Sequence, residues 1–101
     1  MKDRMKLARD FANAIKSKYI KKIIVFGSVA RGEDNEESDI DILIVSTSRE
    51  KIEDTVYDKV FETIMNDEEL ISAHIISEER FKTKKHYSFL SNVIKEGVVI
   101  G

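Results

Sequence analysis

The segment from Asp39 to Val45 carries the side-chain pattern that most limits how this chain can fold. Side chains two residues apart in a strand point to the same face, so Asp39 and Asp41 share one face and Ile40, Ile42 and Ile44 share the other. A slip of one residue would bury two carboxylates and expose three isoleucines. The segment is therefore expected to be a strand of fixed register, with a core on one side and two carboxylates on the other.

The rest of the sequence alternates between helical and strand patterns. Apolar side chains at three- and four-residue spacing predict helices at 3–19, 49–66 and 87–96, the last ending at Gly97 as a C′ glycine. The other expected elements are strands at 23–26, 70–76 and 98–100, a helical turn at 29–32, a polar loop at 33–38 and a short helix capped by Ser77.

The connections between these elements predict the topology. The segment from Gly27 to Ser38 is too short and polar for a crossover helix, so the first two strands are expected to be neighbours. The long helix then links the second strand to the third. We expect an α/β or α+β fold with a small mixed sheet and helices mainly on one face. The side chains expected in the core include Ile52, Val56, Val60 or Phe61, and Ile64 of the long helix, together with Phe11, Phe81 and Phe89.

Length and composition exclude several classes of protein. The 101 residues make one domain, 1–101. The absence of cysteine excludes disulfides, thiolate zinc sites and cysteine nucleophiles. No apolar run reaches the roughly 18 residues of a membrane helix, and the N-terminus lacks a signal-peptide core, so a cytoplasmic protein is expected. A net charge of −2 argues against general nucleic-acid binding, although the basic first helix leaves open an acidic partner or tRNA.

Asp39 and Asp41 form the first candidate functional feature. Two carboxylates on one strand face repel each other unless a cation lies between them. The cation could be Arg, Lys or Mg²⁺, a hard ion that prefers carboxylate oxygens and keeps water or phosphate in its other positions. The alternative is a pair of solvated aspartates at a strand end.

The segment from Gly27 to Gly32 is the second candidate functional feature. Gly27 permits a close approach of the backbone, and Ser28 with nearby N–H groups could hold phosphate oxygens, with Arg31 one turn later as a countercharge. The alternative is a strand-to-turn glycine, a capping serine and a surface arginine. The spacing is not a Walker P-loop, because Glu33 and Asp34 stand where Lys and Ser or Thr are required.

Taken together, these residues resemble a known signature. A Gly-Ser pair after a strand, ten residues, and Asp-x-Asp on the next strand are similar to the motif of DNA polymerase β-like nucleotidyltransferases. The run from Gly27 to Gly32 and the run Ser38 to Ile44 resemble the minimal nucleotidyltransferase (MNT) family. The resemblance implies a nucleoside-triphosphate site in which Gly27, Ser28, Arg31 and Ser38 contact nucleotide, and Asp39 and Asp41 hold two Mg²⁺ ions.

One feature of the family pattern is missing. The family supplies a third carboxylate from a later strand, but the segment from Leu70 to Ile76 contains no acid. His74 lies on the expected face and could act as general base, or it is a strand histidine bonded to a neighbour. Glu68 or Glu69, just before this strand, could also reach the site.

The resemblance implies an Mg²⁺-dependent transfer of a nucleoside monophosphate, AMP from ATP, to a hydroxyl. Small members of the family resemble antitoxins of toxin–antitoxin pairs, which suggests a helical HEPN-type partner protein as the acceptor. Two alternatives stay open. One is a nucleotide-binding module that inhibits its partner stoichiometrically. The other is a small-molecule transferase of the aminoglycoside type, which would need a further domain or a homo-oligomer to build its acceptor site.

Overall fold

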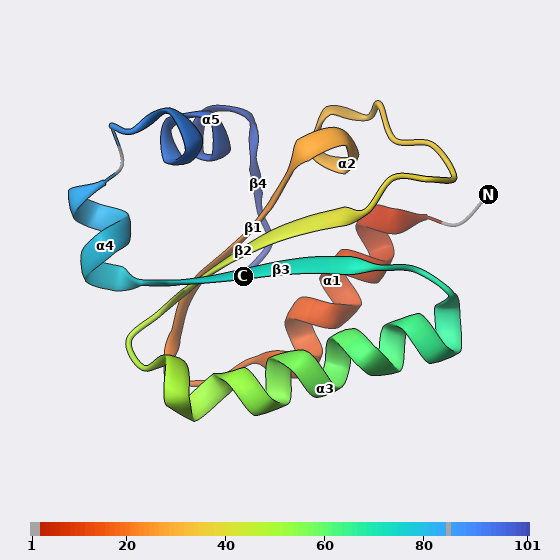
Figure 1. The fold of residues 1–101 in the computed structure, drawn as a ribbon, viewed down its shortest axis with the longest axis horizontal. Coiled ribbons are helices and arrows are strands. Elements are labelled where there is room, and N and C mark those ends of the chain that lie inside the picture. Colours follow the sequence, from red (N-terminus) through yellow and green to blue (C-terminus); the bar gives the residue numbers. More distant parts are fainter. Residues whose placement is uncertain (1–2, 85) are drawn as a thin grey trace.

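The computed structural model describes residues 3–84 and 86–101, and it forms a four-stranded sheet with helices on both faces (Figure 1). The helices and strands, in chain order, are α1 (Arg4–Ile15), β1 (Ile20–Phe26), α2 (Gly27–Arg31), β2 (Ile40–Ser46), α3 (Arg49–Asp67), β3 (Ile71–Ser77), α4 (Glu78–Thr83), α5 (Ser88–Glu96) and β4 (Val98–Val99). No helix in the described ranges is long and apolar enough to cross a membrane.

The strands lie in the order β3-β2-β1-β4. β1 pairs antiparallel with β2 and β4, whereas β2 pairs parallel with β3, so the sheet is mixed. The parallel pair requires a long crossover, which α3 supplies, as the sequence predicted. The predicted neighbourhood of the first two strands is likewise confirmed.

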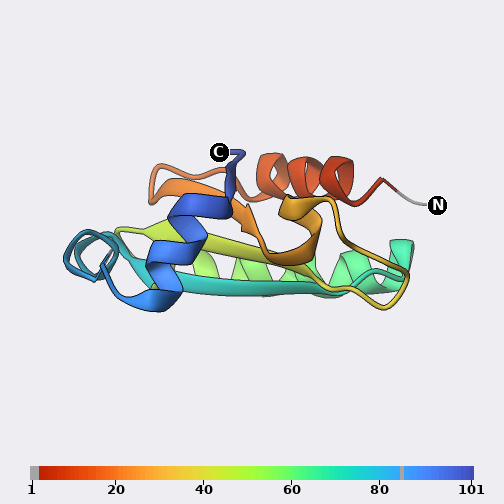
Figure 2. The ribbon, with the colours of Figure 1, turned by 90° about the horizontal axis from the view of Figure 1, so that it is seen from above.

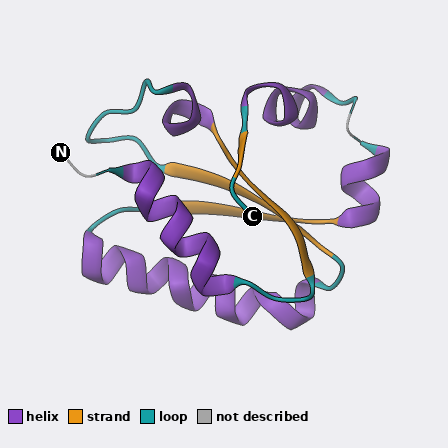
Figure 3. Cartoon of the chain, turned by 180° about the vertical axis from the view of Figure 1, so that it is seen from behind, coloured by secondary structure: helices purple, strands orange, loops and turns teal. Residues whose placement is uncertain are grey.

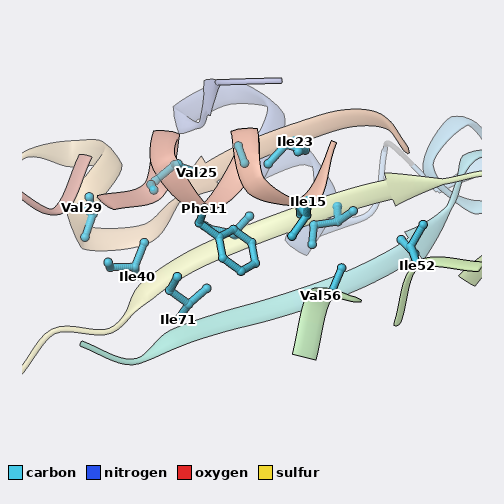
Figure 4. Close-up of a cluster of buried hydrophobic side chains, with 13 residues drawn as sticks. Phe11, Ile15, Ile23, Val25, Val29, Ile40, Ile52, Val56 and Ile71 are labelled. Atoms are coloured by element: carbon cyan, nitrogen blue, oxygen red, sulfur yellow. The ribbon is translucent and has the colours of Figure 1, made fainter. Parts of the chain in front are cut away.

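The larger core lies between the sheet and the two long helices. Ile40, Ile42 and Ile44 of β2 are fully buried there, as their alternation predicted. They pack against α1, which contributes Phe11 and Ile15, and against Ile52 and Val56 of α3 (Figure 4). The prediction that helices lie mainly on one face therefore holds for the two long ones.

The opposite face of the sheet carries a second, smaller core. Leu43 and Val45 of β2 are buried there together with Ile24 of β1, under Leu90 and Val93 of α5. Seen from above, α5 lies in front of the strands and α3 behind them (Figure 2). From Ile42 to Val45, β2 is apolar on both faces and is covered on both sides. Asp41 comes directly before this stretch, where the strand is not covered on both sides.

The ends of two elements differ from prediction by three residues or more. Helix α1 ends at Ile15 rather than near Tyr19, because Lys16 already has extended backbone angles. Strand β1 begins at Ile20, three residues earlier than expected. Its polar residue Lys22 fits a strand because the ammonium group lies 5.6 Å from the centre of the Phe81 ring.

Gly97 follows α5 but is not the left-handed C′ glycine that was predicted. Its backbone is extended, with φ −74° and ψ 158°. A Cβ at this position would collide with Ile24 Cγ2 and with the carbonyl oxygen of Val93. Glycine is therefore required here because the chain passes closely over β1 before it forms β4.

The predicted core assignment is wrong for several large side chains. Phe61 is 64% exposed and Ile64 38% exposed, so the apolar stripe of α3 is buried mainly in its N-terminal half. Phe89 is 51% exposed, whereas Phe11 is buried as expected.

Figure 3 shows α1 and α3 next to each other on the side of the sheet away from α5.

Candidate active site

Asp41 lies in the middle of the sheet, on the face opposite the long helices. Asp41 pairs with Phe26 of β1 on one side and with Ser72 of β3 on the other. The side chain is half-buried, while Asp39, one residue before β2, is exposed. Strand alternation directs both carboxylates to the same face, the one that α5 partly covers.

Among the described residues, none forms an ion pair with the carboxylate of Asp41. Burial raises its pKa above the usual aspartate value, and the negative charge of Asp39 raises it further, although His74 and Arg31 oppose the shift. Neither Asp39 nor Asp41 makes a side-chain hydrogen bond or ion pair with the described residues. Two carboxylates that share a face in this state are suited to bind a hard divalent cation.

Gly27, the residue before Ser28, lies directly against this carboxylate. Gly27 has φ +74°, and a Cβ there would collide with Asp41 Oδ2 and lie 3.2 Å from Asp41 Cγ. Helix α2 starts at Gly27 and ends at Gly32, which has a left-handed backbone, so Ser28 and the first N–H groups of α2 lie beside Asp41. The fold thus brings together two motifs that are separated by ten residues.

Arg31 and Ser38 are held by partners within the chain. Arg31 is exposed and forms ion pairs with Glu33 at 3.1 Å and Glu96 at 3.5 Å. Its charge nevertheless acts on Asp41. The Ser38 hydroxyl accepts a hydrogen bond of 3.0 Å from the backbone N–H of Asn35 and so closes a turn of the acidic loop. The Ser38 hydroxyl still has its own O–H to donate, and Arg31 keeps further N–H donors, so both side chains can donate to a phosphate while these internal contacts persist.

Strand β3 presents Ser72 and His74 beside the two aspartates. Ser72 is directly alongside Asp41, and His74 is alongside Leu43 on the same face. The exposed His74 ring lies 5.7 Å from the Phe26 ring and 6.2 Å from the Phe89 ring, between centroids. Within residues 3–84 and 86–101, no group of three His, Asp or Glu side chains is arranged around one metal position.

Glu69 does not reach this face, contrary to one of the alternatives from the sequence. It is almost fully buried and accepts a hydrogen bond of 3.0 Å from Arg4 Nε. Arg4 also forms an ion pair of 3.0 Å with Asp34 and donates to the carbonyl oxygen of Glu36 at 3.2 Å. Through these contacts Arg4 fixes the acidic loop that leads to Asp39.

The structural role of Arg4 was not predicted from the sequence, although a signal was present. Arg4 lies one turn before Ala8, on the apolar face of α1, where a charged side chain needs a buried partner. The acidic loop at 33–38 offered such partners. A charged residue within an apolar stripe, together with an acidic loop elsewhere in the chain, indicates a buried ion pair between the two.

Two hollows lie on the α5 face of the sheet, and Phe89 lines both of them. The larger, of about 600 Å³, is lined by His74 and Leu43 and, on the α4–α5 side, by Arg80, Lys84 and Tyr87. The smaller, of about 210 Å³, lies beside Gly27 and Arg31. There is therefore open space next to the Gly27 turn and next to His74.

The fold and the paired motifs define a class of enzyme. Residues 8–100 match the family described as "Nucleotidyltransferase domain", and the chain belongs to this family. It is also 47% identical over 98 residues to the protein named "Putative protein adenylyltransferase MJ0604" of Methanocaldococcus jannaschii, an alignment that covers 94% of this chain and 95% of the relative.

Solved structures show the same fold. One is described as a "putative nucleotidyltransferase from Sulfolobus solfataricus", with a TM-score of 0.54, 23% identity, and coverage of 94% of this chain and 77% of the other. Another is described as "the toxin-antitoxin with AMP-PNP", with a TM-score of 0.60, 14% identity, and coverage of 100% and 73%. At these identities the likeness concerns the fold.

Proposed function

We propose that the protein transfers a nucleoside monophosphate, AMP from ATP, to a hydroxyl group of a partner protein, with Mg²⁺ as cofactor. The observation that carries the proposal is the close packing of the Gly27–Ser28 turn against Asp41. Through this packing, the turn that we propose as phosphate-binding adjoins a half-buried carboxylate, which makes no ion pair with any described residue. A triphosphate with its metal would supply both the anion and the cation that these groups lack.

Each site residue has a defined task in this proposal. Ser28 and the N–H groups at the start of α2 bind the β- and γ-phosphate oxygens, where Gly27 allows the closest approach. Arg31 and Ser38 contribute further contacts to the nucleotide. Asp39 and Asp41 are the residues that would hold two Mg²⁺ ions. Bound there, the metal would neutralise the charge that develops on the phosphates.

The reaction is a displacement at the α-phosphorus. The acceptor oxygen forms a new P–O bond, the bond to the β-phosphate oxygen breaks, and pyrophosphate leaves. Because the attacking and leaving oxygens lie roughly in line, an acceptor opposite Ser28 approaches from the β3 side, where His74 is located. His74 would accept the proton of the acceptor hydroxyl as a general base.

The acceptor is proposed to be a protein of the HEPN type. The support comes from the relatives, since one is named as a protein adenylyltransferase and two solved neighbours are described as toxin–antitoxin structures. The hollow beside His74 is open to solvent, and His74 lies two residues after Ser72, the β3 partner of Asp41, so a side chain presented by a second protein could enter it.

A second candidate function is a nucleotide-binding module that inhibits its partner without turnover. The observation in its favour is Ser72, which occupies the strand position directly beside Asp41 where a third carboxylate would stand. In this case the Gly27–Ser28 turn and the two aspartates would bind Mg²⁺ and nucleotide, but the partner would remain unmodified.

Label transfer tests the proposal. The protein is incubated with Mg²⁺ and α-³²P-ATP in lysate of its source, with γ-³²P-ATP in a parallel reaction. We expect a protein band labelled only from the α position, lost in Asp41→Asn and retained in Asp10→Asn, a matched change at an exposed position of α1. Label from γ-³²P-ATP, or equal transfer by Asp41→Asn, would overturn it. Absence of transfer while Mg²⁺·ATP still raises the Tm would favour the binding module.

A further inference from the structure

The outer face of α3 exposes a row of large apolar side chains. Tyr57 is 44% exposed, Phe61 64% and Met65 65%, at a spacing of four residues, with Ile64 beside them at 38%. The buried residues of the helix, Ile52, Val56 and Thr63, lie on its other side. These side chains therefore form an apolar ridge, Tyr57–Phe61–Met65, that points away from the protein's own core.

A second ridge runs parallel to the first and is acidic. It consists of Glu50, Asp54, Asp58 and Glu62, again four residues apart and all exposed. Like charges at this spacing destabilise a helix. Within the described part of the chain, only Glu62 of the four has an ion pair, with Lys59 at 3.1 Å. Positive charge from outside the chain would relieve the repulsion.

We propose that this surface of α3, made of the apolar ridge and the acidic ridge, docks a protein partner through a helix with apolar residues flanked by Lys and Arg. The apolar ridge would bury against the apolar face of the partner helix, and the acidic ridge would meet its basic flank. A second copy of this chain that packed through its own α3 would bring another set of the same acids. An anionic lipid surface would be repelled.

The position of the surface separates docking from the reaction site. Helix α3 covers the face of the sheet opposite to Asp41, so a partner can bind α3 while the nucleotide site stays open (Figure 1). The inference does not depend on the proposed transfer. The Asp41→Asn variant, which should be unable to transfer AMP, should bind such a partner as well as the wild type.

A synthetic peptide provides the probe. It is an amphipathic helix of about five turns (~18 residues) with Leu on one face and Lys on the other, and its control carries Glu in place of Lys. Binding is measured by fluorescence anisotropy, and the contact surface is mapped by amide chemical-shift changes. We expect the Lys peptide alone to bind, with shifts centred on residues 54–65 and an affinity that falls as salt increases.

Variants on the exposed surface sharpen the test without disturbing the core. Phe61→Ser with Met65→Ser, and separately Asp54→Lys with Asp58→Lys, should each weaken binding roughly tenfold or more. Ile94→Ser, which removes an exposed apolar side chain from α5, should leave binding unchanged. Thermal unfolding verifies that each variant is folded.

Two results would overturn the inference. The first is unchanged peptide affinity in the Phe61→Ser, Met65→Ser variant, or shifts that map to α4 and α5. The second is a wild-type dimer in sedimentation that the same double substitution dissociates, because the occupant would then be a second copy of the chain.

Discussion

The backbone of Gly27 lies so close to Asp41 that a Cβ on Gly27 would overlap the Asp41 carboxylate. This contact joins the turn after β1 to the start of β2, and Ser28 directly follows the residue that touches Asp41, the half-buried member of the Asp39–Asp41 pair. The proposed nucleotide site depends on this contact more than on any other.

Replacement of Gly27 tests that contact. Gly27→Ala should lower the free energy of unfolding by about 2–3 kcal/mol, because it adds a steric clash to the cost of a left-handed backbone. It should also abolish Mg²⁺·ATP binding. Gly32→Ala is the matched control, since Gly32 has φ +70° but no atom within 4 Å of where the added methyl group would lie, and it should cost only about 1–2 kcal/mol. Equal losses in the two variants, measured by urea unfolding, would show that the clash is unimportant.

Asp41 should reduce stability at neutral pH. Burial raises its pKa in the folded protein above the unfolded value, so the ionised carboxylate opposes folding wherever the pH exceeds the raised pKa. Asp41→Asn should therefore raise the Tm at pH 7, and the difference should shrink as the pH falls below the folded-state pKa and vanish below the unfolded-state pKa, where the carboxyl is protonated in both states. Mg²⁺ should raise the Tm of the wild type but not of Asp41→Asn. A lower Tm for Asp41→Asn at pH 7 would contradict the assignment.

The ion pairs of Arg4 should stabilise the fold. Arg4 is 5% exposed, and its removal would leave the buried Glu69 without a partner, so Arg4→Met should cost about 3 kcal/mol. The double variant Arg4→Met, Glu69→Gln should recover part of that loss. The exposed pair of Lys6 with Asp10 is the comparison, because Lys6→Met should change stability by no more than about 0.5 kcal/mol. Chemical denaturation of the wild type, the two single variants and the double variant gives the coupling energy, and additive losses at Arg4 and Glu69 would argue against a coupled pair.

His74 should affect the rate more than the binding of nucleotide. Under the proposed role as a base, His74→Gln should lower the rate of transfer by about 10²–10⁴-fold with little change in the affinity for Mg²⁺·ATP. His86→Gln, at the exposed second histidine, should leave both unchanged. A rate loss of less than about threefold in His74→Gln would remove this residue from the reaction, since proton transfer by a positioned base is worth far more.

The central part of the fold could be predicted because local pattern and tertiary structure agree there. The alternation from Asp39 to Ile44 determines both the strand and the face that each side chain occupies, and burial of Ile40, Ile42 and Ile44 follows. The Gly27–Ser28 turn and the aspartates could be paired from sequence because their spacing resembles a family motif. That spacing alone did not reveal the direct contact between Gly27 and Asp41.

Features that depend on tertiary contacts were harder to predict. Glu69 was a plausible site residue until its bond to Arg4 was seen, and these two residues are 65 positions apart. Gly97 has the sequence signature of a helix end, but its requirement is the close passage over Ile24. Phe61 has core spacing on α3, yet no described element of this chain covers it. In each case the partner, or its absence, lies outside the local sequence.

Titration calorimetry of Mg²⁺·AMP-PNP is the most direct test of the central claim, that the Gly27–Ser28 turn and the two aspartates form one metal–triphosphate site. We predict binding by the wild type and by Asp54→Asn, and loss of binding when Mg²⁺ is omitted, in Asp41→Asn and in Gly27→Ala. Binding of equal affinity by the wild type and Asp41→Asn, or binding that needs no divalent cation, would contradict the account.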